Sequence, residues 1–353
     1  MTALVIDRDQ QARIAGLMER CRRMHTHPRE SMPMIIIDAA SPGLPGWKER
    51  LADPRVMMEA QLEEMRSHLA LRDDCIPTLR VEFGTGQVAA AFGCEIVYPD
   101  NSYPAVGSNA VKNAEDAFTL APPSLDAGMY PRLAAFTKYF REHMPEGMRI
   151  QQPDLQSPFN CAHLIRGNDI LTDFIDNPRA VDALLDVVTD YLVALVPHLR
   201  AMVDAEDGWF LDYGALWKGS ARISNCTMHL ISPAFYRGHV LARDRRLFES
   251  IGGGRIHYCG TNTQVVDDFL SIPRCHGFDF ISGMDYDEVW KLAARTPDST
   301  VIMRNVDAGT PEMERLLAGD WPRKRNIIIK SHCASLDEGR EILARLRAAA
   351  ARG

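Results

Sequence analysis

Residues 252–260 contain the side chains best suited to hold a transition metal. A short β-like run there ends in His257, Tyr258 and Cys259. Side chains two residues apart in a strand point to the same side, so the imidazole of His257 and the thiolate of Cys259 can converge on one ion. The tripeptide alone is a weak signal in a chain with 8 Cys and 11 His. Its position at a strand end is what favours a metal site.

Another thiol follows an apolar run late in the chain, where residues 326–330 lead toward Cys333. In a parallel barrel all strands end at one mouth, so Cys333 is predicted to join His257 and Cys259. Two sulfurs and one nitrogen with an open fourth position are typical of a catalytic zinc site. The alternative for each cysteine is a core thiol, because free cysteine is among the most buried residue types.

Polar side chains that follow other apolar runs are candidates for the same mouth. Asp279 or Asp285 could complete the metal site, as a ligand or by orienting the histidine; the alternative is a solvated loop acid. Asp212 is the candidate for acid/base catalysis or substrate contact, with a helix N-cap or loop hydrogen bond as the alternative. Asn305 and Asp307 are predicted to bind substrate, although turn chemistry explains them almost as well.

Other chemically suggestive residues are assigned structural roles. Cys226 follows the run 222–225 and could face the mouth, but it is interpreted as a buried thiol. Gly84 and Gly86 are interpreted as part of a turn, since the full glycine fingerprint of an anion-binding loop is missing. The histidines without a partner at ligand spacing are His163, His229, His239 and His276.

Short β-like runs recur along the whole chain and are separated by longer helical patterns. They are residues 34–37, 78–83, 149–152, 209–212, 222–225, 255–259, 278–281, 301–304 and 326–330. Strands that alternate with helices predict an α/β fold with a parallel sheet, and this number of strands suits a (β/α)8 TIM barrel. Helical spacing after Asn177 and a capping-box pattern at Ser335 and Glu338 predict two of its helices.

The length of 353 residues fits either one large barrel or two ordinary domains. We find no internal repeat, low-complexity tract or linker, so residues 1–353 are predicted to form a single barrel domain. Residues 1–145 are less regular than the rest. They are expected to supply N-terminal helical additions and the first strands of the barrel.

Composition and charge exclude several classes of protein. The chain is 46% hydrophobic and 25% charged with a net charge of −7, which is typical of a globular protein and argues against a nucleic-acid partner. Its cysteines lack the dense spacing of a secreted disulfide scaffold. The N-terminus lacks the apolar core of a signal peptide, and no apolar run approaches the roughly 18 residues of a membrane span. We expect reduced cysteines, no membrane partner and a cytoplasmic location.

Separated blocks over roughly residues 150–335 resemble the uroporphyrinogen decarboxylase-like superfamily. The blocks are Gln152-Pro153 with Ser157-Pro158-Phe159, then 230–236, His257-Tyr258-Cys259-Gly260, Gly277-Phe278-Asp279 and Asn305-Val306-Asp307. Their order makes the resemblance specific. The decarboxylases of this superfamily carry an N-terminal Arg-Gln-Ala-Gly-Arg-Tyr block, which this sequence lacks. The chain is more similar to the zinc-dependent cobamide:coenzyme M methyltransferase branch.

The resemblance implies a barrel with its site at the carboxyl-terminal mouth, and Zn²⁺ held by a His-x-Cys motif plus a distant Cys. His257, Cys259 and Cys333 match that pattern. The implied reaction moves a methyl group from a methylated corrinoid, free or on a partner corrinoid protein, to a small-molecule thiol. Arg304 and Ala308 depart from the family pattern and leave the substrate open. Two alternatives remain: a metal-independent lyase of the decarboxylase type acting through Asp212, and a non-catalytic corrinoid- or metal-binding protein.

Overall fold

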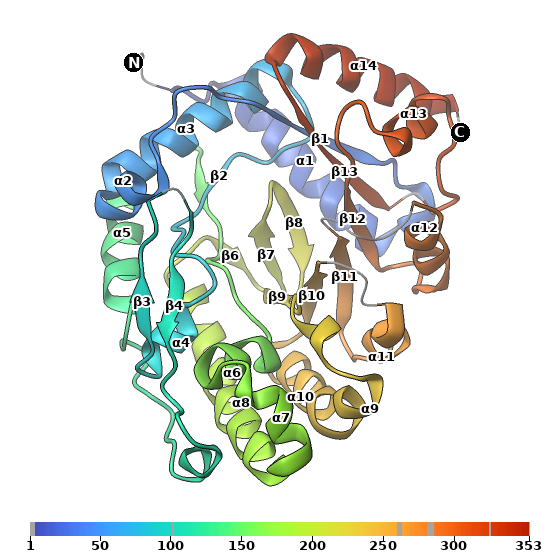
Figure 1. Cartoon of the computed structure of the whole chain (residues 1–353). Helices are drawn as coiled ribbons and strands as arrows, with labels where there is room; N and C mark the ends of the chain where they lie inside the picture. The colour runs from blue at the N-terminus through green and yellow to red at the C-terminus, as the bar shows by residue number, and fades with distance from the viewer. Residues whose placement is uncertain (1–3, 101, 260–262, 281–285, 325, 353) are drawn as a thin grey trace.

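Parallel strands form a closed ring whose outside is covered by helices (Figure 1). The computed structural model describes residues 4–100, 102–259, 263–280, 286–324 and 326–352. The ring strands there are β1 (Met34–Ala39), β2 (Thr78–Leu79), β5 (Arg149–Ile150), β9 (Ala221–Ser224), β10 (Gly254–Tyr258), β11 (Cys275–Phe280), β12 (Val301–Asn305) and β13 (Ile327–Cys333). This arrangement confirms the predicted (β/α)8 barrel.

Most of the ring is held by backbone hydrogen bonds. One six-stranded parallel sheet has the order β1-β13-β12-β11-β10-β9, and β2 pairs with β5 in parallel. The chain after β5 reaches β9, because the Ser224 amide donates to the carbonyl of Leu155 at 2.9 Å and the Ser224 carbonyl accepts the Ser157 amide at 2.9 Å. The short β5 therefore continues into an irregular but hydrogen-bonded segment that joins the two sheets.

Carboxylates close the remaining gap, beside β1. The side chain of Asp74 accepts the amide of Ile35 at 2.9 Å, and that of Asp73 accepts the amide of Ile37 at 2.7 Å. The Asp74 amide also donates to the Ile35 carbonyl at 2.8 Å. Unpaired backbone amides inside a protein are destabilising, so these two aspartates replace a neighbouring strand along the edge of β1.

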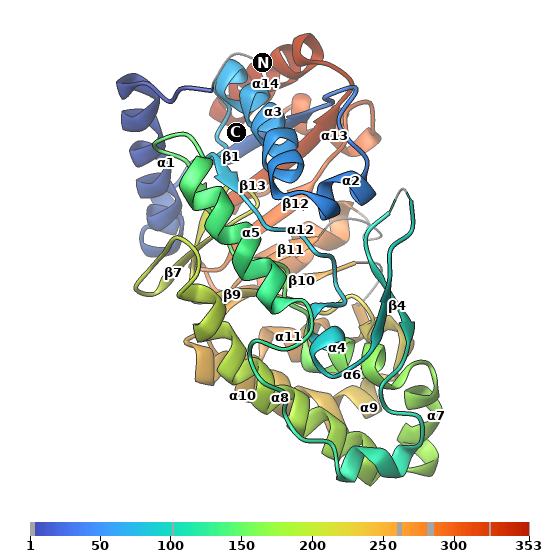
Figure 2. The ribbon, with the colours of Figure 1, turned by 90° about the vertical axis from the view of Figure 1, so that its left-hand side faces the viewer.

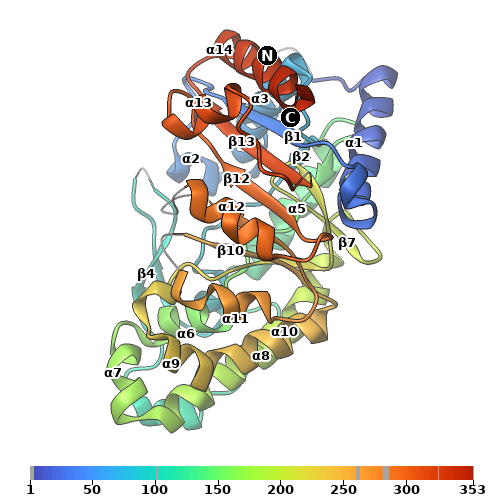
Figure 3. The ribbon, with the colours of Figure 1, turned by 90° about the vertical axis from the view of Figure 1, so that its right-hand side faces the viewer.

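Helices flank the ring on both sides (Figures 2 and 3). They are α1 (Arg8–Thr26), α2 (Trp47–Ala52), α3 (Pro54–Leu71), α4 (Gln87–Ala91), α5 (Tyr130–His143), α6 (Pro158–Arg166), α7 (Asp169–Asp176), α8 (Pro178–Arg200), α9 (Pro233–Phe235), α10 (Leu241–Ile251), α11 (Val266–Leu270), α12 (Tyr286–Arg295), α13 (Pro311–Leu317) and α14 (Leu336–Arg352). A π-helical turn, Tyr236–Val240, joins α9 to α10. None of the helices in the described part of the chain is long and apolar enough to cross a membrane.

The two helices predicted from sequence are present. Helix α8 follows Asn177 and buries the apolar face predicted for it. Before α14, the Ser335 hydroxyl accepts the amide of Glu338 at 3.2 Å, and the Glu338 carboxylate accepts the amide of Ala334 at 2.7 Å. The less regular residues 1–145 supply β1, β2, five helices and an antiparallel pair, β3 (Glu95–Val97) and β4 (Ala105–Ser108). A continuous apolar core runs through both parts of the chain.

An antiparallel hairpin lies inside the ring (Figure 1). The run predicted at 209–212 is strand β7 (Trp209–Asp212), which pairs with β6 (Ala205–Glu206) and β8 (Ala215–Lys218) and not with a barrel strand. A Cβ atom on Gly277 of β11 would lie 2.6 Å from the Trp217 ring, and one on Gly214 would lie 3.4 Å from Ile36 of β1. The hairpin thus touches inward-facing positions of strands from different parts of the ring. We call it the luminal hairpin.

Candidate active site

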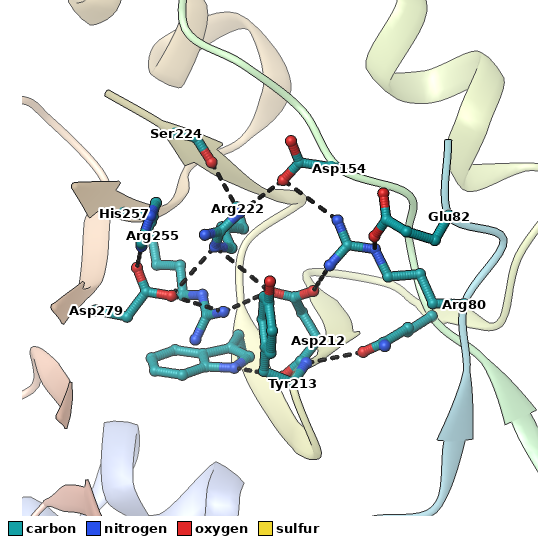
Figure 4. Close-up of polar contacts among 12 residues, drawn as sticks. Arg80, Glu82, Asp154, Asp212, Tyr213, Arg222, Ser224, Arg255, His257 and Asp279 are labelled. Atoms are coloured by element: carbon teal, nitrogen blue, oxygen red, sulfur yellow. Dashed lines mark hydrogen bonds and ion pairs between the residues drawn. The ribbon is translucent and has the colours of Figure 1, made fainter. Parts of the chain in front are cut away.

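Charged side chains fill the mouth of the barrel, above the luminal hairpin (Figure 4). Alternation along β10 sends Arg255 and His257 into the barrel and Ile256 toward the helices. The pairing register between β10 and β11 places Asp279 beside His257. Arg255 has 0% exposure and Asp279 has 3%. Charges buried so deeply are stable only when they are paired.

Ion pairs connect three arginines to three aspartates, which we call the mouth network: Arg80, Asp154, Asp212, Arg222, Arg255 and Asp279. Asp279 lies 3.1 Å from Arg222 Nε and 3.0 Å from Arg255 Nη2. Asp154 lies 2.7 Å from Arg222 Nη1 and 3.2 Å from Arg80 Nη2. The formal charges of the network offset one another.

Asp212, the predicted catalytic acid or base, lies at the end of β7 in this network. Its carboxylate pairs with Arg255 and lies 3.8 Å from Arg80 and 4.0 Å from Arg222. Its side chain therefore reaches the mouth, as the sequence suggested, but from the luminal hairpin. The ion pairs account for its burial, and its catalytic role stays a prediction.

Asp279 orients His257. Its Oδ1 lies 2.7 Å from His257 Nδ1, so a proton on Nδ1 leaves Nε2 free to act as an acceptor or metal ligand. Burial would raise the pKa of Asp279, but the charges of Arg255, His257 and Arg222 hold it well below its ordinary value. Asp279 thus lies behind the imidazole and is not among the clustered donor atoms, and its part in a metal site stays a prediction.

Those donor atoms belong to Cys226, His257 and Cys259, which we call the thiol cluster. One ligand atom from each lies within 4.8 Å of the others, and among the described residues this group alone could hold a metal ion in this way. Cys259 Sγ lies 3.2 Å from His257 Nε2 and 3.5 Å from Cys226 Sγ. The cysteines follow the neighbouring strands β9 and β10, which brings their side chains to one place.

The two thiols have opposite acidities. Without a metal ion, the charge of Asp279 raises the pKa of His257, and the protonated imidazole can donate from Nε2 to Cys259. This hydrogen bond and the one from the Cys226 thiol lower the pKa of Cys259 to about 4, so that Cys259 is a thiolate. The hydrogen bond to Cys259, together with burial, raises the pKa of Cys226 well above its ordinary value. A thiolate, a second thiol and an oriented imidazole are a donor set that zinc accepts, with room for a further ligand. The residues present therefore fit the metal that the sequence resemblance implies.

Cys333, the predicted third ligand, lies apart from this cluster. Its Sγ donates to the Ser335 carbonyl at 3.3 Å, and a Cβ atom on Gly339 of α14 would lie 3.2 Å from it. On the same strand, Lys330 and His332 both approach the carboxylate of Asp38 inside the barrel. Because neighbouring side chains of a strand alternate, Cys333 points toward helix α14, and the structure places Cys226 where Cys333 was expected.

The remaining candidates lie at or near the mouth. Asn305 is the last residue of β12 and is partly buried. Asp307 is exposed, and its carboxylate lies 2.9 Å from His332 Nδ1. Their predicted contact with substrate stays a prediction. Asp285 lies outside the described residues.

A cavity with a volume of about 410 Å³ opens beside the mouth network on the β1 and β13 side. Its polar lining includes Asp38, His68, Arg80, Tyr213, Lys330 and His332. Asp38 lies 2.8 Å from Lys330 Nζ and 3.4 Å from His68 Nε2. Burial would raise the pKa of Asp38, but the charges of Lys330 and His68 hold it well below its ordinary value. The cavity has the size of a small-molecule site.

Comparison with protein families agrees with this geometry. A model of the uroporphyrinogen decarboxylase (URO-D) family matches residues 38–313 of the chain. The chain belongs to the URO-D family. The superfamily resemblance seen in the sequence is thereby confirmed, and the barrel is the URO-D fold.

One solved structure of similar shape is a methyltransferase from Methanosarcina mazei. It matches this URO-D family chain with a TM-score of 0.68 and 16% sequence identity, over 95% of this chain and 98% of that chain. At this identity the likeness shows a shared fold. No curated protein matches the sequence.

Several residues of this URO-D family site were missed by sequence reasoning. Arg80, Arg222 and Arg255 each belong to a β-like run, and a charge inside a buried strand is itself a signal of a paired site. Asp38 directly follows the run 34–37, and Lys330 is the last residue of the run 326–330. Those positions could have been found from the pattern, whereas their pairing across the barrel required the fold.

Proposed function

We propose that this protein is a zinc-dependent methyltransferase that moves a methyl group from a methylated corrinoid, free or bound to a partner protein, to a small thiol. The observation that supports this proposal most directly is the thiol cluster with its oriented histidine. Bound zinc would supply Lewis-acid chemistry, lowering the pKa of a substrate thiol so that it reacts as a thiolate near neutral pH.

The residues of the chain would do the rest. Cys226, His257 and Cys259 would hold the ion, and two thiolates would lower its net charge, which favours a nucleophilic sulfur. Asp279 would keep the Nδ1 proton on His257 and so keep Nε2 directed at the ion. Arg222 and Arg255 would keep Asp279 ionised. The mouth network thus supports the imidazole from behind.

The corrinoid donor and the thiol acceptor come from the family resemblance. The name of the similar structure, a methyltransferase from Methanosarcina mazei, supports the same class of reaction. We propose a soluble, cytoplasmic enzyme with no nucleic-acid partner, in agreement with the charge balance of the chain.

The URO-D family also contains decarboxylases, so a metal-independent lyase acting through Asp212 is the second candidate. A substrate with several carboxylates needs several available cations. Arg80 is paired with Glu82 at 3.0 Å and Lys330 with Asp38 at 2.8 Å, and both line the cavity. This pairing favours the methyltransferase. A corrinoid- or metal-binding protein without activity is the third candidate.

Metal content tests the proposal. It also shows whether Cys226 or Cys333 is the second thiol ligand. We expect purified protein to carry one zinc per chain, and Cys226→Ser, Cys259→Ser and His257→Ala to lose it. Cys333→Ser is the matched control and should keep zinc, because its thiol faces α14. Loss of zinc from Cys333→Ser but not from Cys226→Ser would overturn the assignment of Cys226 as the second thiol ligand.

Activity tests the reaction itself. Zinc-loaded protein should transfer the methyl group of methylcobalamin to 2-mercaptoethanol, followed by the change in corrinoid absorbance, and Cys259→Ser should abolish the transfer. Full activity of metal-free protein would reject the mechanism. Stoichiometric zinc without any methyl transfer would support the non-catalytic alternative, and turnover of a porphyrinogen by metal-free protein would support the lyase.

A further inference from the structure

The two cysteines of the thiol cluster lie opposite each other after neighbouring strands. Ser224 of β9 is paired in parallel register with His257 of β10, and the amide of Asn225 donates to the His257 carbonyl at 2.7 Å. Cys226 and Cys259 each follow that pair by two residues, so the same register sets them side by side and on one face. Their sulfurs lie 3.5 Å apart. The strand pairing therefore brings the two thiols together.

This arrangement is close to that of a disulfide. Neighbouring strands lie about 4.7–4.9 Å apart, and the Cα atoms of disulfide-bonded cysteines are usually separated by about 4.4–6.8 Å. A sulfur–sulfur bond is about 2.05 Å long, so sulfurs that start 3.5 Å apart have to approach by about 1.5 Å. Rotation of each side chain about its Cα–Cβ bond can supply such a movement. The bond can then form with little change in the backbone.

The pair is also more exposed than most cysteines of the chain. Cys226, Cys259 and Cys275 are half-buried, whereas the other five cysteines are buried. Cys275 lies at the start of β11, and its thiol donates to the carbonyl of Gly277 at 3.4 Å. Exposed sulfurs are the ones that small oxidants reach. Cys226 and Cys259 thus combine exposure with a second sulfur at close range.

We propose that Cys226 and Cys259 are a redox-sensitive pair, which hydrogen peroxide converts into a reversible disulfide. One sulfur loses its proton and attacks a peroxide oxygen; the O–O bond breaks, and a sulfenic acid and hydroxide form. The second thiol then attacks the sulfenic sulfur, and the displaced hydroxyl leaves with the thiol proton as water. Two thiols and one peroxide thereby give one disulfide and two water molecules.

The disulfide removes two of the three donors of the thiol cluster. Zinc binds cysteine as the thiolate, and a disulfide sulfur carries no such charge. A zinc ion held there is therefore released on oxidation, and the site is restored when a dithiol reduces the bond. The loss of metal rests on the proposed function, whereas the disulfide itself needs neither zinc nor substrate.

Thiol counting and peptide mapping on the purified protein test the inference. After treatment with a small excess of hydrogen peroxide, the eight thiols that react with Ellman's reagent in denaturant should fall by two per chain. Dithiothreitol should restore them. The tryptic fragments 223–237 and 256–274 each contain a single cysteine, so mass spectrometry of the linked fragments identifies the bond. A chromogenic chelator measures the zinc released in the same samples.

Cys275→Ser is the matched control, because this cysteine is half-buried as well but its thiol contacts a carbonyl. This variant should still lose two thiols reversibly, whereas Cys226→Ser should give no linked fragments. An unchanged thiol count in the wild type, or a disulfide that joins other fragments, would overturn the inference even if Cys226→Ser failed to fold. Linked fragments from protein that carried no zinc before oxidation would support the disulfide and count against the proposed function, so the two failures are distinguishable.

Discussion

Replacing Asp279 by Asn should destabilise the fold and weaken the metal site together. The change keeps the size of the side chain but removes the charge shared by Arg222, Arg255 and His257. Asp279 has 3% exposure, and removing one partner of a buried ion pair costs about 3–5 kcal/mol. Arg255 keeps Asp212 as a partner, so we expect about 3 kcal/mol, at the lower end of that range.

Urea denaturation followed by circular dichroism measures this loss. Asp307→Asn is the matched control, because that carboxylate is 62% exposed and, among the described residues, forms an ion pair only with His332. It should change the free energy of unfolding by less than about 1 kcal/mol. A similar change for both variants would refute the argument from burial.

The same variant tests the support given to His257. An asparagine amide can place its nitrogen or its oxygen toward Nδ1, so the imidazole loses its fixed proton. Loss of such an outer partner typically weakens metal affinity about 10–100-fold. Competition with a chromogenic zinc chelator measures this. Unchanged zinc affinity in Asp279→Asn would mean that His257 is oriented by something other than this carboxylate.

Two further predictions concern the packing of the lumen and one buried acid. Gly277→Ala should destabilise the protein by about 1–3 kcal/mol, since the added Cβ would lie 2.6 Å from the Trp217 ring. Gly238→Ala is the control in the same denaturation assay, because a Cβ there would have no described atom within 4 Å. Burial raises the pKa of Asp244 to about 7, although the Tyr236 hydroxyl donates to its carboxylate at 2.8 Å. The folded state therefore keeps a proton that the unfolded chain loses near pH 4, and this contribution to stability falls as the pH rises from about 4 to about 7. Unfolding free energies measured across that range should fall less in Asp244→Asn than in wild type, and equal slopes would count against this titration.

The barrel strands could be predicted because each overlaps a short β-like run between helical patterns. This holds for every ring strand in the described part of the chain. The run at 209–212 has the same composition, but it belongs to the luminal hairpin. The composition of a run can indicate that a strand is buried. It does not indicate which other strand or helix packs against it. Gly277, where a Cβ atom would meet the Trp217 ring, is a hint of a hairpin in the lumen.

The mouth network was missed for a different reason. Arg222 and Arg255 belong to β-like runs, and a charged side chain in such a run faces either solvent or a buried partner. Their partners Asp154 and Asp279 come from the segment after β5 and from β11. The pairing depends on the curvature of the whole ring, and sequence spacing carries no information about it.

Cys333, whose thiol lies beside α14, shows what strand alternation could have indicated in advance. Lys330 and His332 are charged or polar, so they point into the open mouth, and Cys333 must then point to the other side. The same rule applied to β9 places Arg222 and Ser224 inside the barrel, where Arg222 Nη1 lies 2.7 Å from Ser224 Oγ. Continuing that alternation brings Cys226 to the mouth. The alternation of side chains along a strand therefore favours Cys226 over Cys333 as the second thiol ligand. Position at a strand end does not distinguish the two cysteines.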